Sequence, residues 1–127
     1  MPSSHAVAVL IVSPDGIPLV RDPKKPAPRY WKLPGGRSHG NETPEECAAR
    51  EIDEELGLEI EIDDLHMIEQ YDRGSHTLTF FKLQLASLHG INAIGNEGEE
   101  IKVFAKYDLT KIPDLFPNHF EVIQKAL

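Results

Sequence analysis

Cysteine is almost absent from this chain of 127 residues, in which Cys47 is the only example. A single thiol forms no intrachain disulfide, so a secreted scaffold held by disulfides is excluded. Long apolar runs are lacking too. Residues 6–12 form a run that is too short for the core of a signal peptide and far too short to span a membrane. We therefore expect a cytoplasmic protein without a membrane segment.

Basic residues are in short supply, with 13 Lys and Arg against 21 Asp and Glu and a formal net charge of −8. This balance argues against a protein whose main task is to grip nucleic acid or an anionic membrane. It leaves room for a polyphosphate substrate, provided that bound cations supply positive charge. The basic residues concentrate in positions 21–37, where we expect phosphates to approach, although a solvated loop would look the same: Arg21, Lys24, Lys25, Arg29, Lys32 and Arg37.

Several functional motifs are missing. The chain contains no Walker A loop, no Gly-x-Gly-x-x-Gly and no His-Glu-x-x-His zinc motif. It also lacks internal repeats, low-complexity tracts and composition shifts, so we expect one domain over residues 1–127. Hydrophobic residues make up 40% of the chain, which is enough to build a core in a domain of this length.

Strands and helices are predicted to alternate along the chain. A C-terminal helix is expected over residues 116–127, with Phe120, Ile123 and Leu127 on one stripe. The turn signal Pro14-Asp15-Gly16 makes residues 17–20 a candidate for the returning strand of a hairpin. Interleaved elements favour an α/β domain with a helix on each face of a sheet. The expected strands are 5–12, 17–20, 30–33, 59–62, 67–71, 78–85 and 101–107.

The clearest helix covers residues 43–56. Thr43 and Glu46 form a Thr-x-x-Glu capping box, Pro44 suits the first helical position, and Gly57 suits the position just past the end. One face of this helix is apolar and is expected to pack on the sheet: Ala48, Ala49, Ile52 and Leu56. Cys47 is interpreted as a packing residue of the helix.

This helix also crowds acidic residues on one side. Glu51 precedes Glu54 by three residues and Glu55 by four, so the three carboxylates share a sector beside the apolar face. Only Arg50 lies near enough on the helix to pair with them. Such crowding is unfavourable unless cations neutralise it, and Mg²⁺ prefers carboxylate oxygens, water and phosphates. An acidic surface patch is the alternative for the helix taken alone.

The spacing of residues 36–58 decides between these interpretations. Gly36 is followed by five residues, Glu42, seven residues and then Arg50-Glu51-Ile52-Asp53-Glu54-Glu55-Leu56-Gly57-Leu58. This segment resembles the Nudix box at every defined position, and the preceding Trp31-Lys32-Leu33-Pro34-Gly35-Gly36 resembles MutT-like members. The resemblance implies an α/β/α sandwich with a mixed β-sheet, and a Mg²⁺-dependent hydrolase, with Mn²⁺ as a substitute, that cuts a diphosphate linkage in a nucleoside-diphosphate-like substrate.

The resemblance also assigns roles. Glu54 and Glu55 would be the principal metal ligands, with Glu51 a further ligand or the group that positions or deprotonates water. Arg50 would orient a glutamate, and the Gly35 carbonyl would join the metal coordination. Gly36, Glu42 and Gly57 would be structural, and Gly36 would let the substrate approach the main chain.

Outside the box, family members often use one more acid as ligand or base. Glu97 matches best, with Glu99 and Glu100 as rivals. Arg21 or the neighbouring lysines would hold an outer phosphate. Asn118, in Phe116-Pro117-Asn118, would contact a nucleobase or, alternatively, cap the last helix.

The box specifies a reaction and leaves the substrate open. No proline occurs over residues 59–90, where ADP-ribose hydrolases tend to have one, and Tyr71 fits the tyrosine of dinucleoside polyphosphate hydrolases poorly. We therefore favour a nucleoside triphosphate, modified forms included, as a small-molecule substrate. The alternatives are a nucleotide sensor without hydrolysis and an RNA 5′-end pyrophosphohydrolase, against which the net charge weighs.

Overall fold

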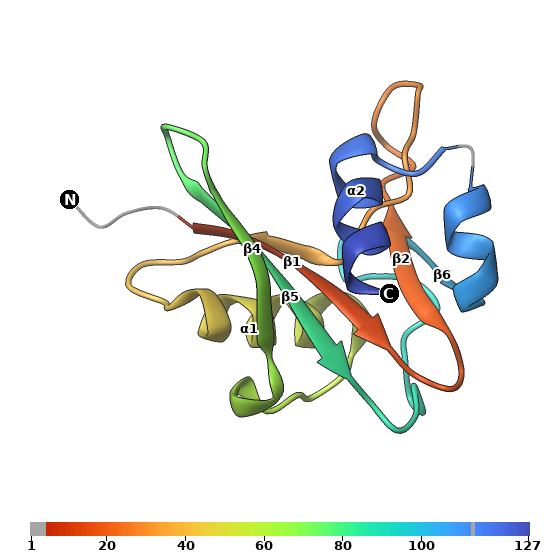
Figure 1. Cartoon of the computed structure of the whole chain (residues 1–127), viewed down its shortest axis with the longest axis horizontal. Coiled ribbons are helices and arrows are strands. Elements are labelled where there is room, and N and C mark those ends of the chain that lie inside the picture. Colours follow the sequence, from red (N-terminus) through yellow and green to blue (C-terminus); the bar gives the residue numbers. More distant parts are fainter. Residues whose placement is uncertain (1–4, 113) are drawn as a thin grey trace.

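The computed structural model describes residues 5–112 and 114–127, excluding the side chains of Thr110 and Asn118. It contains six strands, two α-helices and two short 3₁₀ helices (Figure 1). In chain order these are β1 His5–Val12, β2 Ile17–Arg21, β3 Gly35–Arg37, α1 Pro44–Leu56, η1 Ile62–Asp64, β4 His66–Asp72, β5 Thr77–Gln84, β6 Glu100–Phe104, η2 Lys106–Lys111 and α2 Pro117–Ala126.

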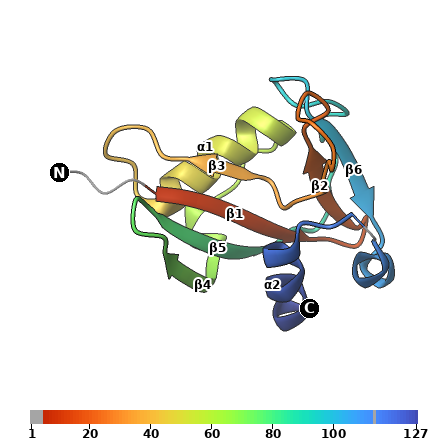
Figure 2. The same ribbon diagram turned by 90° about the horizontal axis from the view of Figure 1, so that it is seen from above.

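Four of the strands form a mixed sheet in the order β3-β1-β5-β4. The pair β1–β5 is parallel, whereas β1–β3 and β4–β5 are antiparallel. The remaining strands, β2 and β6, form a separate antiparallel pair. Helices α1 and α2 lie on opposite sides of the four-stranded sheet (Figure 2), which confirms the expected α/β fold with a mixed sheet between helices.

Alternation along β1 divides the core into two layers. Val7, Val9 and Ile11 pack in the cluster that contains α1, whereas Ala8 and Leu10 pack in the cluster that contains α2. Successive side chains of a strand point to opposite faces, so one strand supplies both layers. All five residues are at most 3% exposed, which makes β1 the centre of the molecule.

Local signals fix the ends of α1 as expected. The Thr43 hydroxyl accepts from the Glu46 backbone N–H at 3.1 Å, and the Glu46 carboxylate accepts from the Thr43 N–H at 2.9 Å. Gly57 ends the helix with a left-handed φ of 71°, which glycine adopts without steric cost. Ala48, Ile52 and Leu56 are fully buried; Cys47 joins them in the core as expected, and Ala49 is half-buried.

Two strand predictions fail, and a third predicted strand forms but pairs differently from the expectation. Residues 17–20 form a strand, but β2 pairs with β6 instead of returning along β1. Residues 30–33 contribute only isolated bridges at Trp31 and Lys32, because this segment runs between β2 and the chain ahead of α2. Residues 59–61 form a loop, and Ile62 begins η1. For residues 17–20 and 30–33, strand partners that are distant in the sequence decide the structure.

The C-terminal helix lies against the second layer of the core. Ile123 is buried and Phe120 packs at the edge, as the stripe predicts, but Leu127 is 36% exposed and Val122 takes the inner place. None of the helices in the described part of the chain is long and apolar enough to cross a membrane.

His119 in α2 is a buried polar link to the segment ahead of β3. Its Nδ1 accepts a hydrogen bond from the Leu33 backbone N–H at 3.0 Å, and its ring stands perpendicular to that of Phe80 with 5.3 Å between centroids. Burial, together with a smaller effect of the charge of Lys32, lowers the pKa of His119 from 6.5 to about 4. The ring is therefore neutral in the folded protein, as an acceptor at Nδ1 requires.

We expect His119 to make the fold sensitive to acid. Between pH 6.5 and 4 the unfolded imidazole binds a proton that the folded one does not, so this contribution to stability falls as the pH falls, by about 3 kcal/mol in total. In urea denaturation at pH 7 and pH 4.5, His119→Gln should lose less stability between the two pH values than the wild type. His89→Gln, at an exposed position, is the control, and equal losses for wild type and His119→Gln would contradict the assignment.

Candidate functional site

Two glycines bring the strand β3 against α1. A Cβ on Gly35 would overlap the Val7 carbonyl oxygen of β1, and a Cβ on Gly36 would overlap the Glu51 carboxylate. Both glycines are part of the extended strand β3, and neither has a positive φ. The glycines are therefore not needed for unusual backbone angles. They are required because the backbone of β1 and the acidic side of α1 approach β3 more closely than a side chain allows.

A cavity of about 380 Å³ opens where these elements meet. It brings together five of the predicted residues, Gly35, Gly36, Glu51, Glu54 and Glu55, with Glu97 on its other wall. The remaining lining residues come from the loop after β2, the loop before β6 and the segments around β3: Val20, Asp22, Lys25, Lys32, His39, Asn96 and Glu99. The acids of the helix thus face a second acidic wall and two lysines.

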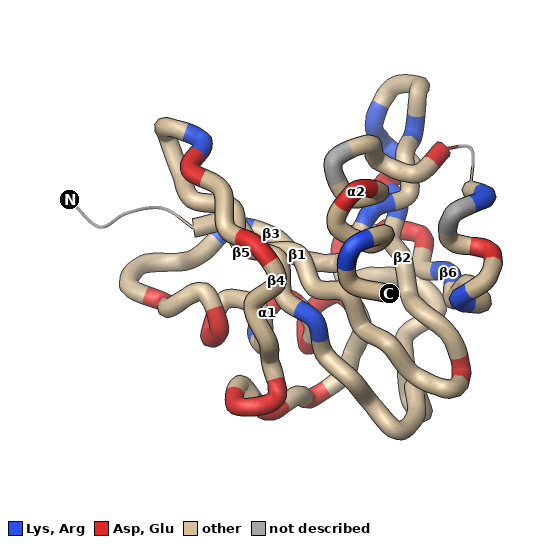
Figure 3. Tube along the Cα trace, viewed as in Figure 1, with Lys and Arg blue, Asp and Glu red and all other residues tan. Residues whose placement is uncertain are grey.

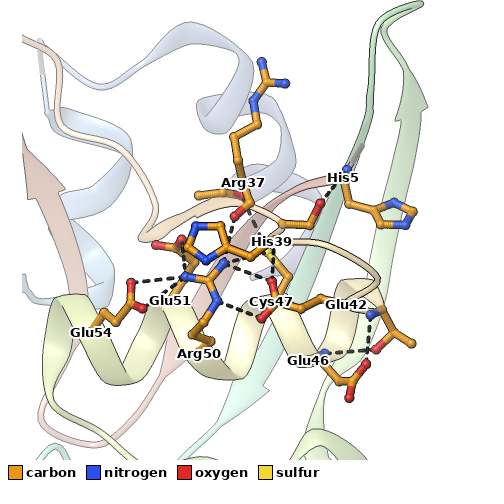
Figure 4. Close-up of polar contacts among 12 residues, drawn as sticks. His5, Arg37, His39, Glu42, Glu46, Cys47, Arg50, Glu51 and Glu54 are labelled. Atoms are coloured by element: carbon orange, nitrogen blue, oxygen red, sulfur yellow. Dashed lines mark hydrogen bonds and ion pairs between the residues drawn. The ribbon is translucent and has the colours of Figure 1, made fainter. Parts of the chain in front are cut away.

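Arg50 is the hub of the acidic side of α1 (Figure 4). Its Nη1 donates to Glu51 Oε1 and to both oxygens of Glu54, each at 3.1 Å. The other edge of the guanidinium holds Glu42, through Nε at 2.7 Å and Nη2 at 3.0 Å. Nη2 also donates to the Arg37 carbonyl at 2.8 Å. One side chain therefore orients two candidate ligands and fixes the loop that follows β3.

Glu42 braces this loop, as the resemblance implied. Besides the two bonds from Arg50, its carboxylate accepts from the His39 backbone N–H at 2.7 Å. The Arg50 guanidinium and this backbone bond lower the pKa of Glu42 from 4.5 to about 2. The hydrogen bonds of Arg50 to Glu42 and Glu54 in turn raise the pKa of Arg50, with Glu42 contributing most. Such a forked, charge-assisted pair is stronger than an ordinary surface ion pair.

The three glutamates of α1 differ in burial. Glu55 is only 7% exposed, and its Oε1 accepts from the Gly35 N–H at 3.1 Å. Burial, with smaller effects of the charges of Glu51 and Glu99, raises the pKa of Glu55 to about 8 against the lowering effect of that bond. Burial likewise raises the pKa of Glu51. Glu54 is the most open, with 39% of its side chain exposed.

Of the three acids considered outside the box, Glu97 and Glu99 reach the cavity and Glu100 does not. Glu100 lies opposite Arg21 in the β2–β6 pair and binds it at 2.7 Å. Glu99 is the more enclosed of the other two, because its Oε1 is buried without a hydrogen-bond partner among the described residues. Spacing in the sequence pointed to Glu97, and only the fold reveals that Glu99 lies beside Glu55.

The cations at the cavity are lysines. Arg21 is not part of the described cavity wall. It binds Glu100 and Asp114, and its Cζ atom lies over the Trp31 ring, 4.3 Å from the ring centroid. Lys25 and Lys32 line the cavity instead. Figure 3 shows basic positions on the loop that follows β2, which agrees with the local excess of charge in the sequence.

Asn118 lies inside α2, whose N-cap is Phe116, so the interpretation of Asn118 as a helix cap is wrong. Its side chain lies outside the described residues, and its contact with a nucleobase stays a prediction. His39 and Asn96 are lining residues that no motif indicated, since each depends on where its loop folds.

The donors at this site suit a hard divalent cation. Carboxylate oxygens from Glu51, Glu54, Glu55 and Glu99 face one cavity, and one buried oxygen of Glu99 lacks a partner among the described residues. Burial, together with the charges of Glu51 and Glu99, disfavours ionisation of Glu55. Within the described chain, no three acidic, imidazole or thiol groups already stand together as a metal cluster. Nη1 of Arg50 binds Glu51 and Glu54 together, and the Gly35 N–H binds Glu55.

Comparison with known proteins agrees with this geometry. The NUDIX domain family model matches residues 2–126. The chain belongs to the NUDIX domain family. A crystal structure of a NUDIX-family hydrolase from Clostridium perfringens is similar over 100% of both chains, with a TM-score of 0.77 and 20% identity. The Nudix fold predicted from residues 36–58 is thereby confirmed.

Two curated relatives resemble parts of this Nudix domain. An 8-oxo-dGTP diphosphatase from Proteus vulgaris is 45% identical over 31 residues, which are 24% of this chain and 28% of the relative. A MutT-like protein from Streptomyces ambofaciens is 39% identical over 66 residues, which are 50% of this chain and 42% of the relative. The matches thus span less than half of each relative, and they support the MutT-like resemblance.

We expect the Arg50 hub to couple the loop after β3 to α1 energetically. In a double-mutant cycle of Glu42→Gln and Arg50→Lys, the coupling measured by urea denaturation at pH 7 should be about 1–2 kcal/mol, because lysine cannot reproduce the fork to Glu42. Asp53→Asn, at an exposed position of the same helix, should show no coupling to Arg50→Lys. Additive effects of Glu42→Gln and Arg50→Lys would contradict a direct pair.

Proposed function

We propose that this Nudix domain is a Mg²⁺-dependent pyrophosphohydrolase, which accepts Mn²⁺ as a substitute and cleaves a diphosphate linkage in a nucleoside triphosphate, modified bases included. The observation that carries this proposal is the convergence of Glu51, Glu54 and Glu55 on one cavity together with Lys25 and Lys32. An acidic cluster beside lysines suits a substrate whose phosphates arrive with a cation. The likeness to an 8-oxo-dGTP diphosphatase and to a MutT-like protein supports the choice of substrate class.

Each side chain has a distinct task in this proposal. Glu54, Glu55 and Glu51 would hold the divalent cation with the Gly35 carbonyl, and Arg50 would keep Glu51 and Glu54 in orientation. When bound, the cation neutralises the diphosphate oxygens and makes a nearby water more acidic.

Lys25 and Lys32, which line the cavity, would contact the phosphates that extend from the cation. Water adds to one phosphorus, the bridging oxygen leaves with the other phosphate, and a glutamate on the wall formed by Glu97 and Glu99 accepts the proton. The protein contributes to such a reaction mainly by binding and orienting the phosphates and by stabilising their charge.

The function is tested first by a substrate panel. The purified chain is incubated with Mg²⁺ and nucleoside triphosphates, oxidised nucleotides, ADP-ribose, dinucleoside polyphosphates and 5′-triphosphate RNA, and phosphate and pyrophosphate release are measured. We expect nucleoside triphosphates to be preferred and a chelator to stop turnover reversibly. Binding of nucleotides without cleavage would instead identify a sensor, and a preference for RNA with a steep salt dependence would identify an RNA hydrolase.

Glu54→Gln should lower kcat to less than a hundredth of the wild-type value while the thermal unfolding curve changes little. The reason is that an open carboxylate with its side chain 39% exposed carries little packing energy but is proposed as a metal ligand. Asp53→Asn, at the neighbouring exposed position of α1, should keep full activity. Retention of a tenth of the wild-type kcat by Glu54→Gln would remove Glu54 from the principal ligands.

Glu99→Gln should reduce kcat more than Glu97→Gln does. Glu99 is half-buried and interacts with Glu55, whereas Glu97 is exposed and uses its backbone carbonyl to bind Lys24 at 3.1 Å. Steady-state rates of both variants with the preferred substrate measure the difference, and Glu100→Gln, at the first residue of β6 and outside the cavity wall, serves as the control. A larger loss in Glu97→Gln would restore the assignment that the spacing favours.

A further inference from the structure

Two loops leave the same end of the β2–β6 pair. Arg21 and Glu100 are the last residues of this antiparallel ladder to face each other, and their side chains bind at 2.7 Å. Residues 22–30 follow this point in the chain and residues 95–99 precede it. Both segments line the cavity that the proposed function uses, and Figure 2 shows the two loops side by side beyond the strands. Two walls of the cavity therefore start from one base.

A hydrogen bond also joins the two loops beyond this base. Lys24 Nζ donates to the Glu97 backbone carbonyl at 3.1 Å, and we call this contact the cross-loop bond. A Cβ on Gly98 would lie 3.8 Å from the end of the same lysine side chain. Lys24 is not part of the described cavity wall. Its ammonium group therefore contacts the backbone of the 95–99 loop outside the cavity.

The backbone that carries Lys24 is held within its own loop. The Asp22 carboxylate accepts from the Lys24 N–H at 2.9 Å, and the Asp22 carbonyl accepts from the Lys25 N–H at 3.4 Å. Arg29 Nε donates to the Lys25 carbonyl at 2.8 Å. An aspartate that bonds to the backbone two residues later is a common way to fix a turn. Lys24 and the cavity residue Lys25 therefore project from one braced turn.

The orientation of Glu99 depends on the shape of the other loop. The Gly95 N–H donates to the Glu99 carbonyl at 2.9 Å, and the Gly98 N–H donates to the Gly95 carbonyl at 3.0 Å. The Glu99 side chain folds back over Gly95, where a Cβ would lie only 2.7 Å from Oε2. The Glu99 carboxylate therefore keeps its place only while the 95–99 loop stays closed on itself.

We propose that Lys24 is a positioning residue, whose bond to the Glu97 carbonyl holds the 95–99 loop in the closed form that directs Glu99 into the cavity. This inference rests on the proposed function. A single hydrogen bond at the surface stabilises a domain only slightly. A short exposed loop, however, opens at a small free-energy cost, so loss of this bond displaces Glu99 without unfolding the core.

The cross-loop bond also connects two tasks of the proposed reaction. Lys25 belongs to the loop that contacts the phosphates, and Glu99 belongs to the loop that accepts the proton. Because Lys24 joins these loops, the separation between the phosphate contact and the acid is fixed before the substrate arrives. Such fixed geometry raises the rate of the chemical step more than it raises the affinity for the substrate.

Steady-state kinetics with the preferred nucleoside triphosphate test the role of Lys24. Lys24→Met should lower kcat about fivefold and leave KM within about twofold, whereas Lys25→Met should mainly raise KM. Lys24→Arg should restore kcat to within about twofold of the wild type, because a guanidinium can donate to a single carbonyl. Lys106→Met removes the same charge from an exposed position of η2, away from the cavity, and should behave as the wild type.

A double-mutant cycle shows whether Lys24 acts through Glu99. In a Glu99→Gln background, Lys24→Met should change kcat by less than about twofold, because no acid is left to position. The full loss in that background would overturn the proposal. A rise in KM equal to that of Lys25→Met would overturn it too, since it would place Lys24 on the phosphates themselves.

Amide exchange measured by NMR on the free protein separates this proposal from the proposed hydrolysis. In Lys24→Met the N–H groups of Gly95 and Gly98 should exchange with water about five times faster than in the wild type, and Lys24→Arg and Lys106→Met should match the wild type. Unchanged exchange in Lys24→Met would overturn the cross-loop bond, even if the wild type hydrolyses nucleoside triphosphates. Faster exchange in a protein that cleaves nothing in the panel would support the bond and refute the hydrolysis.

Discussion

The guanidinium of Arg50 is the interaction on which the candidate site depends. Three carboxylates, those of Glu42, Glu51 and Glu54, bind to this one cation. Without it, the acids of α1 would repel each other and the loop after β3 would lose its attachment to the helix. The order of the loop and the orientation of the acids are therefore consequences of the same set of bonds, and neither can change without the other.

The helix presents its glutamates at graded depth. Glu55 is turned toward the core and reaches the backbone of β3, Glu51 lies between, and Glu54 faces the opening. This gradient follows from helical geometry, since residues three and four apart share a side but differ in angle from the buried face. It gives chemically identical groups different proton affinities: burial raises the pKa of Glu55 and Glu51 in the absence of a compensating cation.

The parts of the molecule that could be predicted from sequence are those whose causes are local. The ends of α1 follow from Thr43, Glu46 and Gly57, and the acidic side of the helix follows from spacing within one turn. The partner of β2 could not be predicted in this way, because it is β6, about eighty residues later. The partners of Arg21 could not be predicted for the same reason, because Glu100 and Asp114 lie far away in the sequence.

The positions of Glu97 and Glu99 likewise depend on contacts that spacing in the sequence does not reveal. Both follow Gly95 in one short loop, and the spacing alone favours Glu97. The loop closes on itself through the Gly95 N–H and the Glu99 carbonyl at 2.9 Å, and this closure turns the Glu99 side chain inward. A hydrogen bond that spans four residues thus decides which acid is enclosed.

The loop over residues 22–30, which follows β2, carries Lys25 of the cavity but belongs to neither the four-stranded sheet nor α1. Insertions or substitutions there would leave the capped helix and its acids intact, because residues 22–30 are part of neither core cluster. Substrate preference can therefore change during evolution while the acidic residues of α1 stay the same. A close relative with the same box and a different loop would be expected to act on a different molecule.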